Sequence, residues 1–228
     1  MALTLYELGG LSDRRYSLFS WRARYALAHK GLTPEHNPVR VSDKAAIAFS
    51  KQDKVPILVD DGETIQDSFR IAQHLETKYP DRPLFGGEIG QSLSRFMNSW
   101  VDRAIVPRLV PLFVIDVLGI IDEGDGAHMR RTIEKAFGKT LEELSANREK
   151  DVAALRRLFD PARASLRSQP FICGSQPAYA DYIVFSPLQW ARIVAPADIL
   201  EPGDALAAWR ERMLDLHGGL GRTTPART

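Results

Sequence analysis

The segment 54–68 constrains the fold more than any other part of the chain. Val55 and Pro56 open a short aliphatic run that predicts a strand. Proline has no N–H to give to a sheet, so we expect Pro56 at a strand edge or at the first residue of the strand, and the Val55-Pro56 bond is one where the cis isomer costs little. Such an edge leaves the carbonyl and N–H of Val55 free to pair with an extended peptide.

The second half of this segment predicts a turn and a helix start. The sequence Asp-Asp-Gly at residues 60–62 predicts a tight hairpin turn, after which Ile65 begins a second short strand. Asp67 and Ser68 fall where a helix beginning at Phe69 needs its N-cap, and free N–H groups there favour a carboxylate. Edge prolines and helix caps are common individually. Together they predict a seat for a small peptide with a free carboxylate.

Length and composition limit the class of protein. At 228 residues we expect one large or two modest domains, and a net charge of +1 gives no case for nucleic acid or an anionic membrane as partner. No run of about 18 apolar residues predicts a membrane span, and residues 1–7 predict a strand, not a signal peptide. Cys173 is the only cysteine, which suits a reducing cytoplasm, and the five histidines lack the clustering of a metal site. We therefore expect a cytoplasmic protein without a metal.

The chain divides at a segment rich in proline and glycine. We expect a first domain over 1–82, a linker over 83–89 and an all-helical domain over 90–228. The first domain has the element order βαβαββα of a thioredoxin-like domain. Its predicted elements are strands at 3–8 and 37–41, strands beginning at Ile57 and Thr64, and helices at 16–30, 45–49 and 69–78, with Gly31 as a left-handed helix end.

The second domain reads as helical almost throughout. Residues 91–118 form a long apolar segment that Pro107 and Pro111 should kink or break. Further helices are predicted within 130–158, over 179–194 and over 205–216.

A thiol peptide seated at Val55 needs a donor that holds its sulfur as thiolate. Lowering the thiol pKa from about 8.5 toward neutrality makes the sulfur nucleophilic near pH 7, and a hydroxyl at a helix N-terminus favours the anion. Ser17, at the start of the first helix, is the leading candidate, and an ordinary N-cap is its structural alternative. Other possible donors are Ser12, Ser20, Tyr16 and Tyr6.

Two further groups of residues complete the predicted site. Lys54 adjoins the strand edge and is the favoured partner for a terminal carboxylate. Aromatic and sulfur side chains of the helical domain, together with Phe19, are candidates for a pocket that holds an aromatic co-substrate, although such residues are more often core. Alternatives to Lys54 are Arg40, Lys44, Lys51 and Gln52, and the pocket candidates are Phe19, Phe96, Met97, Trp100, Phe113, Tyr182, Phe185 and Trp190.

The stretch 174–182 contains an incomplete helix-capping motif. A side chain at the N-cap and a carboxylate three residues later normally satisfy the free amides of a helix start. Asp181 supplies the carboxylate, but the N-cap position holds Ala178, which cannot accept a hydrogen bond. The defect should cost about 1 kcal/mol unless Asp181 or water compensates.

These residues together resemble the cytosolic glutathione S-transferase superfamily over essentially the whole chain. Within it the chain is most similar to the bacterial β-aryl-etherases and their fungal FuA-like relatives. The stretches that carry the closer resemblance are 17–27, 60–62, 67–68, 78–83 and 216–222.

The resemblance implies a function and roles for particular residues. Val55 would pair its backbone with the cysteinyl part of glutathione, Asp67 and Ser68 would hold the γ-glutamyl end, and Ser17 would stabilise the thiolate. The resemblance also implies a homodimer in which Asp102 reaches across from the second subunit to the amine. The residues implied in glutathione binding are Lys54, Val55, Pro56, Asp67, Ser68 and Asp102.

The resemblance leaves competing functions open. An etherase-like enzyme would use the thiolate to displace a phenolate from an α-keto aryl ether. The family commonly has proline directly after the catalytic residue, whereas Leu18 stands there in this chain, which fits a non-catalytic carrier of glutathione or an aromatic ligand. A disulfide reductase would need cysteine where Ser17 stands, and is the weakest alternative.

Overall fold

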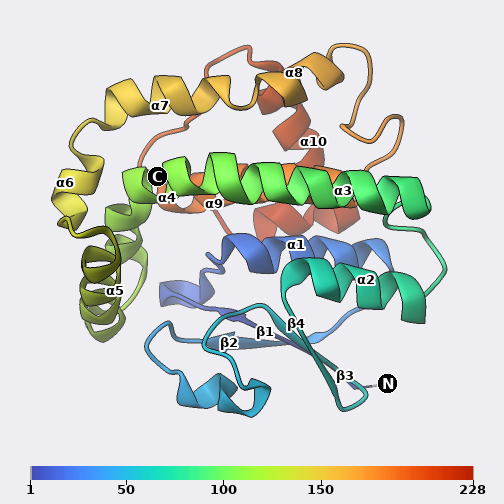
Figure 1. Cartoon of the computed structure of the whole chain (residues 1–228), viewed down its shortest axis with the longest axis horizontal. Helices are drawn as coiled ribbons and strands as arrows, with labels where there is room; N and C mark the ends of the chain where they lie inside the picture. The colour runs from blue at the N-terminus through green and yellow to red at the C-terminus, as the bar shows by residue number, and fades with distance from the viewer. Residues whose placement is uncertain (1, 228) are drawn as a thin grey trace.

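The first third of the chain folds around a small mixed sheet. In the computed structural model, which describes residues 2–227, the strands β1 (Leu3–Leu8), β2 (Glu35–Val39), β3 (Ile57–Asp60) and β4 (Glu63–Gln66) lie in the order β2-β1-β3-β4. β1 and β2 are parallel, and the other neighbours are antiparallel. Helices α1 (Leu18–His29) and α2 (Ser68–Lys78) lie between the sheet and the helical half (Figure 1). The predicted thioredoxin-like fold is confirmed.

The strand after Pro56 is not an edge strand. β3 pairs with β1 on one side and with β4 on the other, so the expectation of an edge is wrong. Pro56 immediately precedes Ile57, the first strand residue, and its peptide bond with Val55 is cis. Its missing N–H therefore falls outside the hydrogen-bonded ladder. Within residues 2–227, the backbone groups of Val55 make no hydrogen bond, so they are free although the strand is interior.

The turn and helix start of the segment 54–68 form as the sequence predicts. Asp61 and Gly62 have φ of 49° and 89°, the left-handed conformations of a tight hairpin turn. α2 begins at Ser68, one residue earlier than predicted, with Asp67 as its N-cap. The Asp67 carboxylate accepts hydrogen bonds from the backbone N–H of Phe69 at 2.9 Å and of Arg70 at 3.1 Å.

The second half of the chain is helical. Pro107 and Pro111 do not break the helical run: a π-helical segment, η3, joins two helices just before Pro107, and Pro111 lies inside the second of them. Gly138, at φ 64°, ends a helix inside the predicted stretch 130–158, which contains the end of this helix and the whole of two others. The elements are α3 (Glu88–Trp100), η3 (Val101–Ile105), α4 (Val106–Val117), α5 (Glu123–Phe137), α6 (Leu141–Ser145), α7 (Arg148–Arg157), α8 (Asp160–Leu166), α9 (Tyr179–Val194) and α10 (Ala205–Gly219).

Short 3-10 helices complete the description. The segment predicted as a helix at 45–49 is one of them, and the helix α8 was not predicted. They are η1 (Leu11–Asp13), η2 (Ala45–Ser50), η4 (Leu118–Ile120) and η5 (Leu220–Thr223). Among the helices between residues 2 and 227, none is both long and apolar enough to cross a bilayer.

The linker is fastened to the first half by one carboxylate. Glu76 of α2 accepts hydrogen bonds from Lys30 Nζ at 2.6 Å and from the backbone N–H groups of Leu84 and Phe85. Beyond the linker, the Tyr179 hydroxyl donates to the carbonyl of Ser68 at 2.7 Å. The two halves are therefore held together by buried polar contacts as well as by a shared apolar core.

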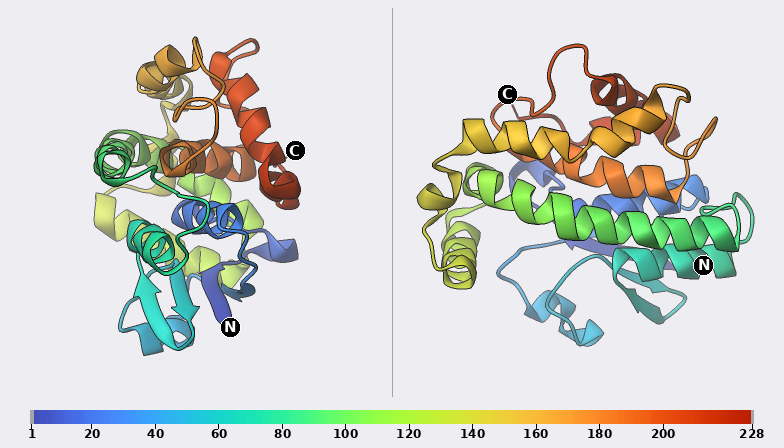
Figure 2. Two further views of the ribbon diagram at one scale, coloured as in Figure 1. Left: turned by 90° about the vertical axis from the view of Figure 1, so that its right-hand side faces the viewer. Right: turned by 45° about the horizontal axis from the view of Figure 1, so that its top comes forward.

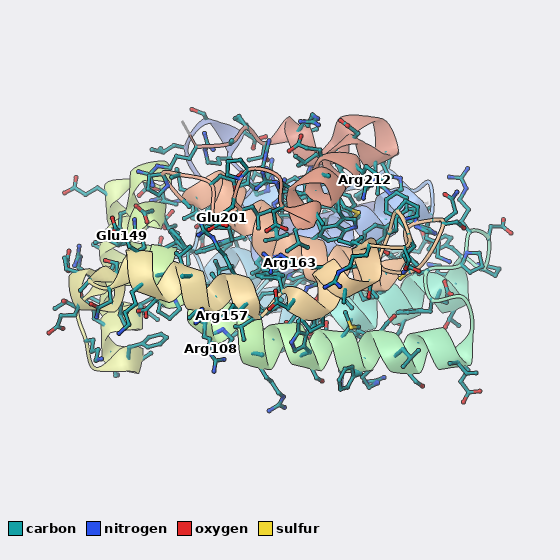
Figure 3. All side chains as sticks on the ribbon, turned by 90° about the horizontal axis from the view of Figure 1, so that it is seen from above. Arg108, Glu149, Arg157, Arg163, Glu201 and Arg212 are labelled. Carbon is teal, nitrogen blue, oxygen red and sulfur yellow. The ribbon has the colours of Figure 1, made fainter. Side chains whose placement is uncertain are left out.

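Helix α9 is the centre of the helical half. It packs against α1, α3 and α4 (Figure 2), and nearly all of its side chains are buried. On the outer face, Arg156 pairs with Glu201 and Arg163 pairs with Asp204, which attaches α7 and α8 to the loop before α10. Figure 3 shows two of these residues, Arg163 and Glu201.

Asp181 makes its own half of the capping motif by accepting from the N–H of Ala178, while the N–H of Asp181 bonds the carbonyl of Ala178 and not a side chain. Its buried carboxylate accepts hydrogen bonds from the N–H of Ile172 at 2.7 Å, of Cys173 and Ala178 at 3.2 Å, and from the indole of Trp209 at 3.1 Å. One carboxylate thus accepts the hydrogen bonds of backbone N–H groups in the loop before α9 and at the N-cap residue of the helix.

We expect Asp181→Ala to lower the free energy of unfolding by about 3–4 kcal/mol, because it leaves buried donors without an acceptor. Chemical denaturation measures the change. Asp151→Ala, which removes an exposed carboxylate of α7, is the control and should change stability by less than about 0.5 kcal/mol. Equal effects of the two substitutions would contradict the role given to Asp181.

Candidate functional site

A cavity of about 330 Å³ lies beside Ser17, between the sheet half and the helical half. Its walls come from the end of β1, the segment 16–19, the segment before β3, and the helices α4 and α5. Eight of the residues named from sequence line it: Tyr16, Ser17, Phe19, Arg40, Lys44, Lys54, Val55 and Trp190.

Ser17 combines a helix cap with a free hydroxyl proton. Its Oγ accepts a hydrogen bond from the backbone N–H of Ser20 at 3.2 Å, as an N-cap does. Throughout residues 2–227 its hydroxyl proton has no acceptor. The hydroxyl can therefore donate toward the cavity while it caps the helix, and the N-terminus of α1 adds a positive potential there.

The segment that carries Ser17 is fixed from several sides. Buried Glu7 of β1 accepts hydrogen bonds from Arg15, Arg24 and His36 at 2.8–3.4 Å. The indole of Trp21 donates to the carbonyl of Arg15 at 3.0 Å. Since Arg15 lies two residues before Ser17, these contacts set the position of the hydroxyl.

The strand register brings the rest of the segment 54–68 together. Ile57 pairs with Gln66, so the start of β3, which follows Val55 and Pro56, lies beside the end of β4, which leads to Asp67 and α2. Pro56 is buried behind this point. Val55 also borders the Ser17 cavity, so its free backbone groups lie between that cavity and the N-terminus of α2.

The residues proposed for carboxylate binding differ in how much of their bonding capacity is used. Lys54 is exposed and, over residues 2–227, makes no hydrogen bond or ion pair. Lys44 Nζ donates to the carbonyl of Asp53 at 2.7 Å, Gln52 bonds Gln66, and Arg40 is held in ion pairs with α5. Lys54 therefore remains the side chain best placed to meet an added anion at this rim.

Asp102 is engaged within its own chain. Its carboxylate accepts from Arg22 at 2.7 Å and from the amide of Asn98 at 2.8 Å. The Arg22 side chain is fully buried and also reaches Ser186 and Asn98. Asp102 stays partly exposed, at 30% of its side chain, on the π-helical segment η3.

The structure places the other predicted pocket residues away from Ser17. Phe96, Met97 and Trp100 border a separate cavity of about 1410 Å³, which shares no lining residue with the first among residues 2–227. Phe113 is buried in the core beneath Arg148, whose guanidinium lies 4.9 Å from the ring centroid. Phe96 is exposed, and Tyr182 and Phe185 are buried.

Part of the cavity wall was not predicted from the sequence, and the portion from α4 is aliphatic. Val106, Val110, Val114 and Val117 form a ladder along α4, and α5 contributes a second set of residues. The valine spacing is a helical stripe that could have been found in the sequence. The α5 residues of the wall are His128, Met129, Thr132 and Ile133.

The possible hydroxyl donors differ in whether they border the Ser17 cavity. Ser12 and Tyr6 do not border the Ser17 cavity, and Ser20 is buried behind it with its backbone N–H on Ser17 Oγ. Tyr16 does border the cavity. Burial, with the nearby carboxylates of Asp125 and Asp122, raises the pKa of Tyr16, so its phenol stays protonated.

No metal centre is assembled from the described residues. Within residues 2–227, no group of three or more histidine, cysteine, aspartate or glutamate side chains gathers that could hold a metal ion.

An ion-pair latch joins the sheet half to α5. Asp125 accepts hydrogen bonds from the backbone N–H and hydroxyl of Ser42 and from Arg40, which also pairs with Asp122. Burial opposes ionisation of Asp125, but the hydrogen bonds from Ser42 and the charge of Arg40 outweigh it and hold its pKa below the ordinary value. The latch keeps α5 against the cavity, beside the β2 edge of the sheet (Figure 1).

The thioredoxin-like half, the helical half and the cavity between them agree with what comparison with known protein families finds. Residues 11–83 match the family model "Glutathione S-transferase, N-terminal domain", and residues 92–216 match "Glutathione S-transferase, C-terminal domain". The chain therefore belongs to the cytosolic glutathione S-transferase superfamily.

The individual curated relatives match only about half of this chain. The glutathione S-transferase-like protein ustS of Aspergillus flavus is 30% identical over 142 residues, which are 56% of this chain and 50% of that protein. Glutathione S-transferase Z1 of Arabidopsis thaliana is 44% identical over 107 residues, which are 45% and 47% of the two chains. The chain thus spans about half the length of the curated relatives that it matches.

Solved structures share the fold over nearly the whole chain. Glutathione transferase GSTFuA3 of Phanerochaete chrysosporium has a TM-score of 0.77 at 23% identity, covering 96% of this chain and 92% of that one. CsGST63524 of Ceriporiopsis subvermispora, solved in complex with glutathione, has a TM-score of 0.76 at 23% identity, covering 98% and 95%.

The latch leads to a testable prediction. We expect Asp125→Ala to increase hydrogen exchange in residues 123–137 about tenfold, because α5 loses its attachment to Ser42 and Arg40. Glu123→Ala removes an exposed carboxylate from the same turn and is the matched control. The stabilising contribution of the ionised Asp125 is fully present above the ordinary aspartate pKa of 3.8. It is lost as the pH falls through the lower pKa that Asp125 has in the folded protein. Unchanged exchange at neutral pH would contradict the latch.

Proposed function

We propose that this protein is a glutathione-dependent transferase that ionises the glutathione thiol at Ser17. The observation that carries the proposal is the Ser17 hydroxyl, which caps α1 on the cavity wall and keeps its proton free. A thiolate sulfur placed there would receive a hydrogen bond and the favourable end of the helix dipole. Both effects lower the thiol pKa.

The remainder of glutathione fits the segment 54–68. The free backbone groups of Val55 would pair with the cysteinyl unit as an added strand. The γ-glutamyl carboxylate would lie at the N-terminus of α2, near Asp67 and Ser68, and the glycyl carboxylate near Lys54. In this proposal residues 1–82 bind glutathione, 83–89 link, and 90–228 carry most of the wall that contacts the co-substrate.

The proposed reaction is nucleophilic substitution on an aromatic electrophile, with cleavage of α-keto β-aryl ethers as the specific candidate. The thiolate attacks the carbon that bears the aryloxy group, a C–S bond forms as the C–O bond breaks, and phenolate leaves with the electron pair. The carbonyl beside the reacting carbon activates it, so the protein mainly supplies the thiolate and the alignment.

A carrier of the same fold is the alternative, and Leu18 after Ser17 is the feature that favours it. The carrier would bind glutathione without lowering the pKa of its thiol. A substrate screen with aryl ethers, chloronitrobenzene and hydroperoxides separates the reactions. It should include double-bond isomerisation, because a relative from Caenorhabditis elegans is named probable maleylacetoacetate isomerase.

We expect Ser17→Ala to reduce kcat/KM about 100-fold to 1000-fold and to raise the pKa of bound glutathione toward its free value near 8.5, while glutathione affinity changes little. Ultraviolet absorbance of the thiolate measures the pKa. Ser12→Ala is the control, because Ser12 lies outside the cavity lining. An unchanged thiol pKa in Ser17→Ala would refute the assignment.

We also infer that the protein forms a homodimer through α3. Ile89, Leu93 and Phe96 recur at helical spacing on this helix and are 61–79% exposed, an apolar stripe that a second copy would bury. Asp102 continues the same helical run, as expected of a residue that approaches the partner's glutathione.

Light scattering after size-exclusion chromatography tests this inference. Phe96→Glu should convert a dimer to a monomer, because it places a charge in the apolar stripe. Phe137→Glu substitutes another exposed phenylalanine, on α5 and outside the stripe, and should leave the dimer intact. A wild-type protein that is monomeric at micromolar concentration would refute the inference.

A further inference from the structure

The hydroxyl of Tyr16 is buried without a partner. Tyr16 directly precedes Ser17, borders the same cavity and is only 2% exposed. Among residues 2–227 its Oη has no hydrogen-bond partner. Leaving a buried hydroxyl unpaired costs about 1–3 kcal/mol, so an unpaired hydroxyl in a native fold calls for an explanation.

The neighbouring carboxylates make their hydrogen bonds with other groups. Asp125 accepts from Ser42 and Arg40, and Asp122 accepts from Arg40 and from the backbone N–H of Asp125. Their negative charge instead keeps the phenol protonated, because they add to the effect of burial on the pKa of Tyr16. Tyr16 is therefore a donor and cannot act as a base at neutral pH.

Within residues 2–227 the facing wall makes no hydrogen bond to Tyr16 Oη either. The valine ladder of α4 has only aliphatic side chains, and the Thr132 hydroxyl of α5 donates to the carbonyl of His128. A molecule that fills the cavity can bring an acceptor to Tyr16. Ser17 and Tyr16 border the same cavity, so a sulfur at Ser17 would lie close to an electrophile that Tyr16 contacts.

We propose that Tyr16 donates a hydrogen bond to an oxygen of the electrophile, namely a carbonyl adjacent to the carbon that the thiolate attacks. This inference rests on the proposed function. It divides the work between neighbouring hydroxyls, with Ser17 on the sulfur and Tyr16 on the electrophile. As the C–S bond forms, negative charge grows on the carbonyl oxygen and the leaving group, and a buried donor stabilises that charge. Tyr16 thereby selects carbonyl-bearing electrophiles.

Paired electrophiles test the proposal by kinetics. Phenacyl chloride carries a carbonyl beside the reacting carbon, and benzyl chloride has the same leaving group without it. Tyr16→Phe should lower kcat/KM for phenacyl chloride about 10-fold to 100-fold and for benzyl chloride less than about twofold, with the pKa of bound glutathione unchanged. Ser17→Ala should lower both rates and raise that pKa. Equal losses for the two electrophiles in Tyr16→Phe would overturn the proposal, and a raised thiol pKa would show that Tyr16 serves the sulfur.

A binding measurement does not depend on turnover. S-phenacylglutathione presents the carbonyl, and S-(2-phenylethyl)glutathione lacks it. Calorimetry should show that Tyr16→Phe weakens binding of the first about 10-fold and leaves the second unchanged. Similar changes for both ligands would overturn the role of Tyr16 even in a non-catalytic carrier, whereas failure of the wild type to bind either would refute the proposed function itself.

Thermal unfolding provides the control for a purely structural role. Because Oη has no partner in the fold, Tyr16→Phe should leave stability unchanged or raise it slightly. A marked fall in the melting temperature would show that the hydroxyl supports the fold, and would count against the proposal.

Discussion

The cavity between the halves depends on one buried charge. Arg22 of α1 is fully buried, and its guanidinium reaches Ser186 of α9, Asn98 of α3 and Asp102 of η3. A buried guanidinium is tolerated only where acceptors surround it, so these three elements must keep their positions around α1. Because Ser17 heads the same helix, the hydroxyl is held in place relative to the helical half that supplies the opposite wall.

Polar contacts of this kind recur wherever the halves meet. Glu76 holds the linker, Asp125 holds α5, and Tyr179 reaches back to the carbonyl of Ser68. Each ties the sheet half to a specific group of the linker or of the helical half, which fixes relative placement more sharply than apolar packing does. The glutathione seat and the electrophile wall come from different halves, so their alignment rests on these contacts.

Local chemistry made much of the fold predictable. The turn at 60–62, the cap at Asp67, the left-handed Gly31 and the helix 179–194 all follow from residues that are neighbours in sequence. The placement of Ser17 at the head of α1 follows in the same way. The interior position of β3 does not, because strand order depends on which segments pair and not on the composition of the strand itself.

The co-substrate wall was the least predictable part of the site. Trp190 and Phe19 do border the Ser17 cavity, but Met97 and Trp100 face a different one, and Phe113 lies in the core. Aromatic content identifies side chains that can line a pocket, whereas the face of a helix that meets the pocket is decided by the packing of the neighbouring helices. The orphaned hydroxyl of Tyr16 is also invisible in sequence, since it is defined by the absence of a nearby acceptor.

The π-helical segment η3 couples two faces of the long helical run, one on α3 and one on α4. An α-helix turns about 100° per residue, so one residue more or fewer between α3 and α4 would rotate one against the other by about that angle. This rotation sets the direction in which the apolar stripe of α3 faces relative to the valine ladder of α4. A single-residue insertion or deletion in η3 would therefore change the outer surface and the cavity wall together, whereas the same change in the turn after α4 would leave the phase of α3 and α4 intact. In related chains, the length of η3 should vary much less than the length of the loops around it.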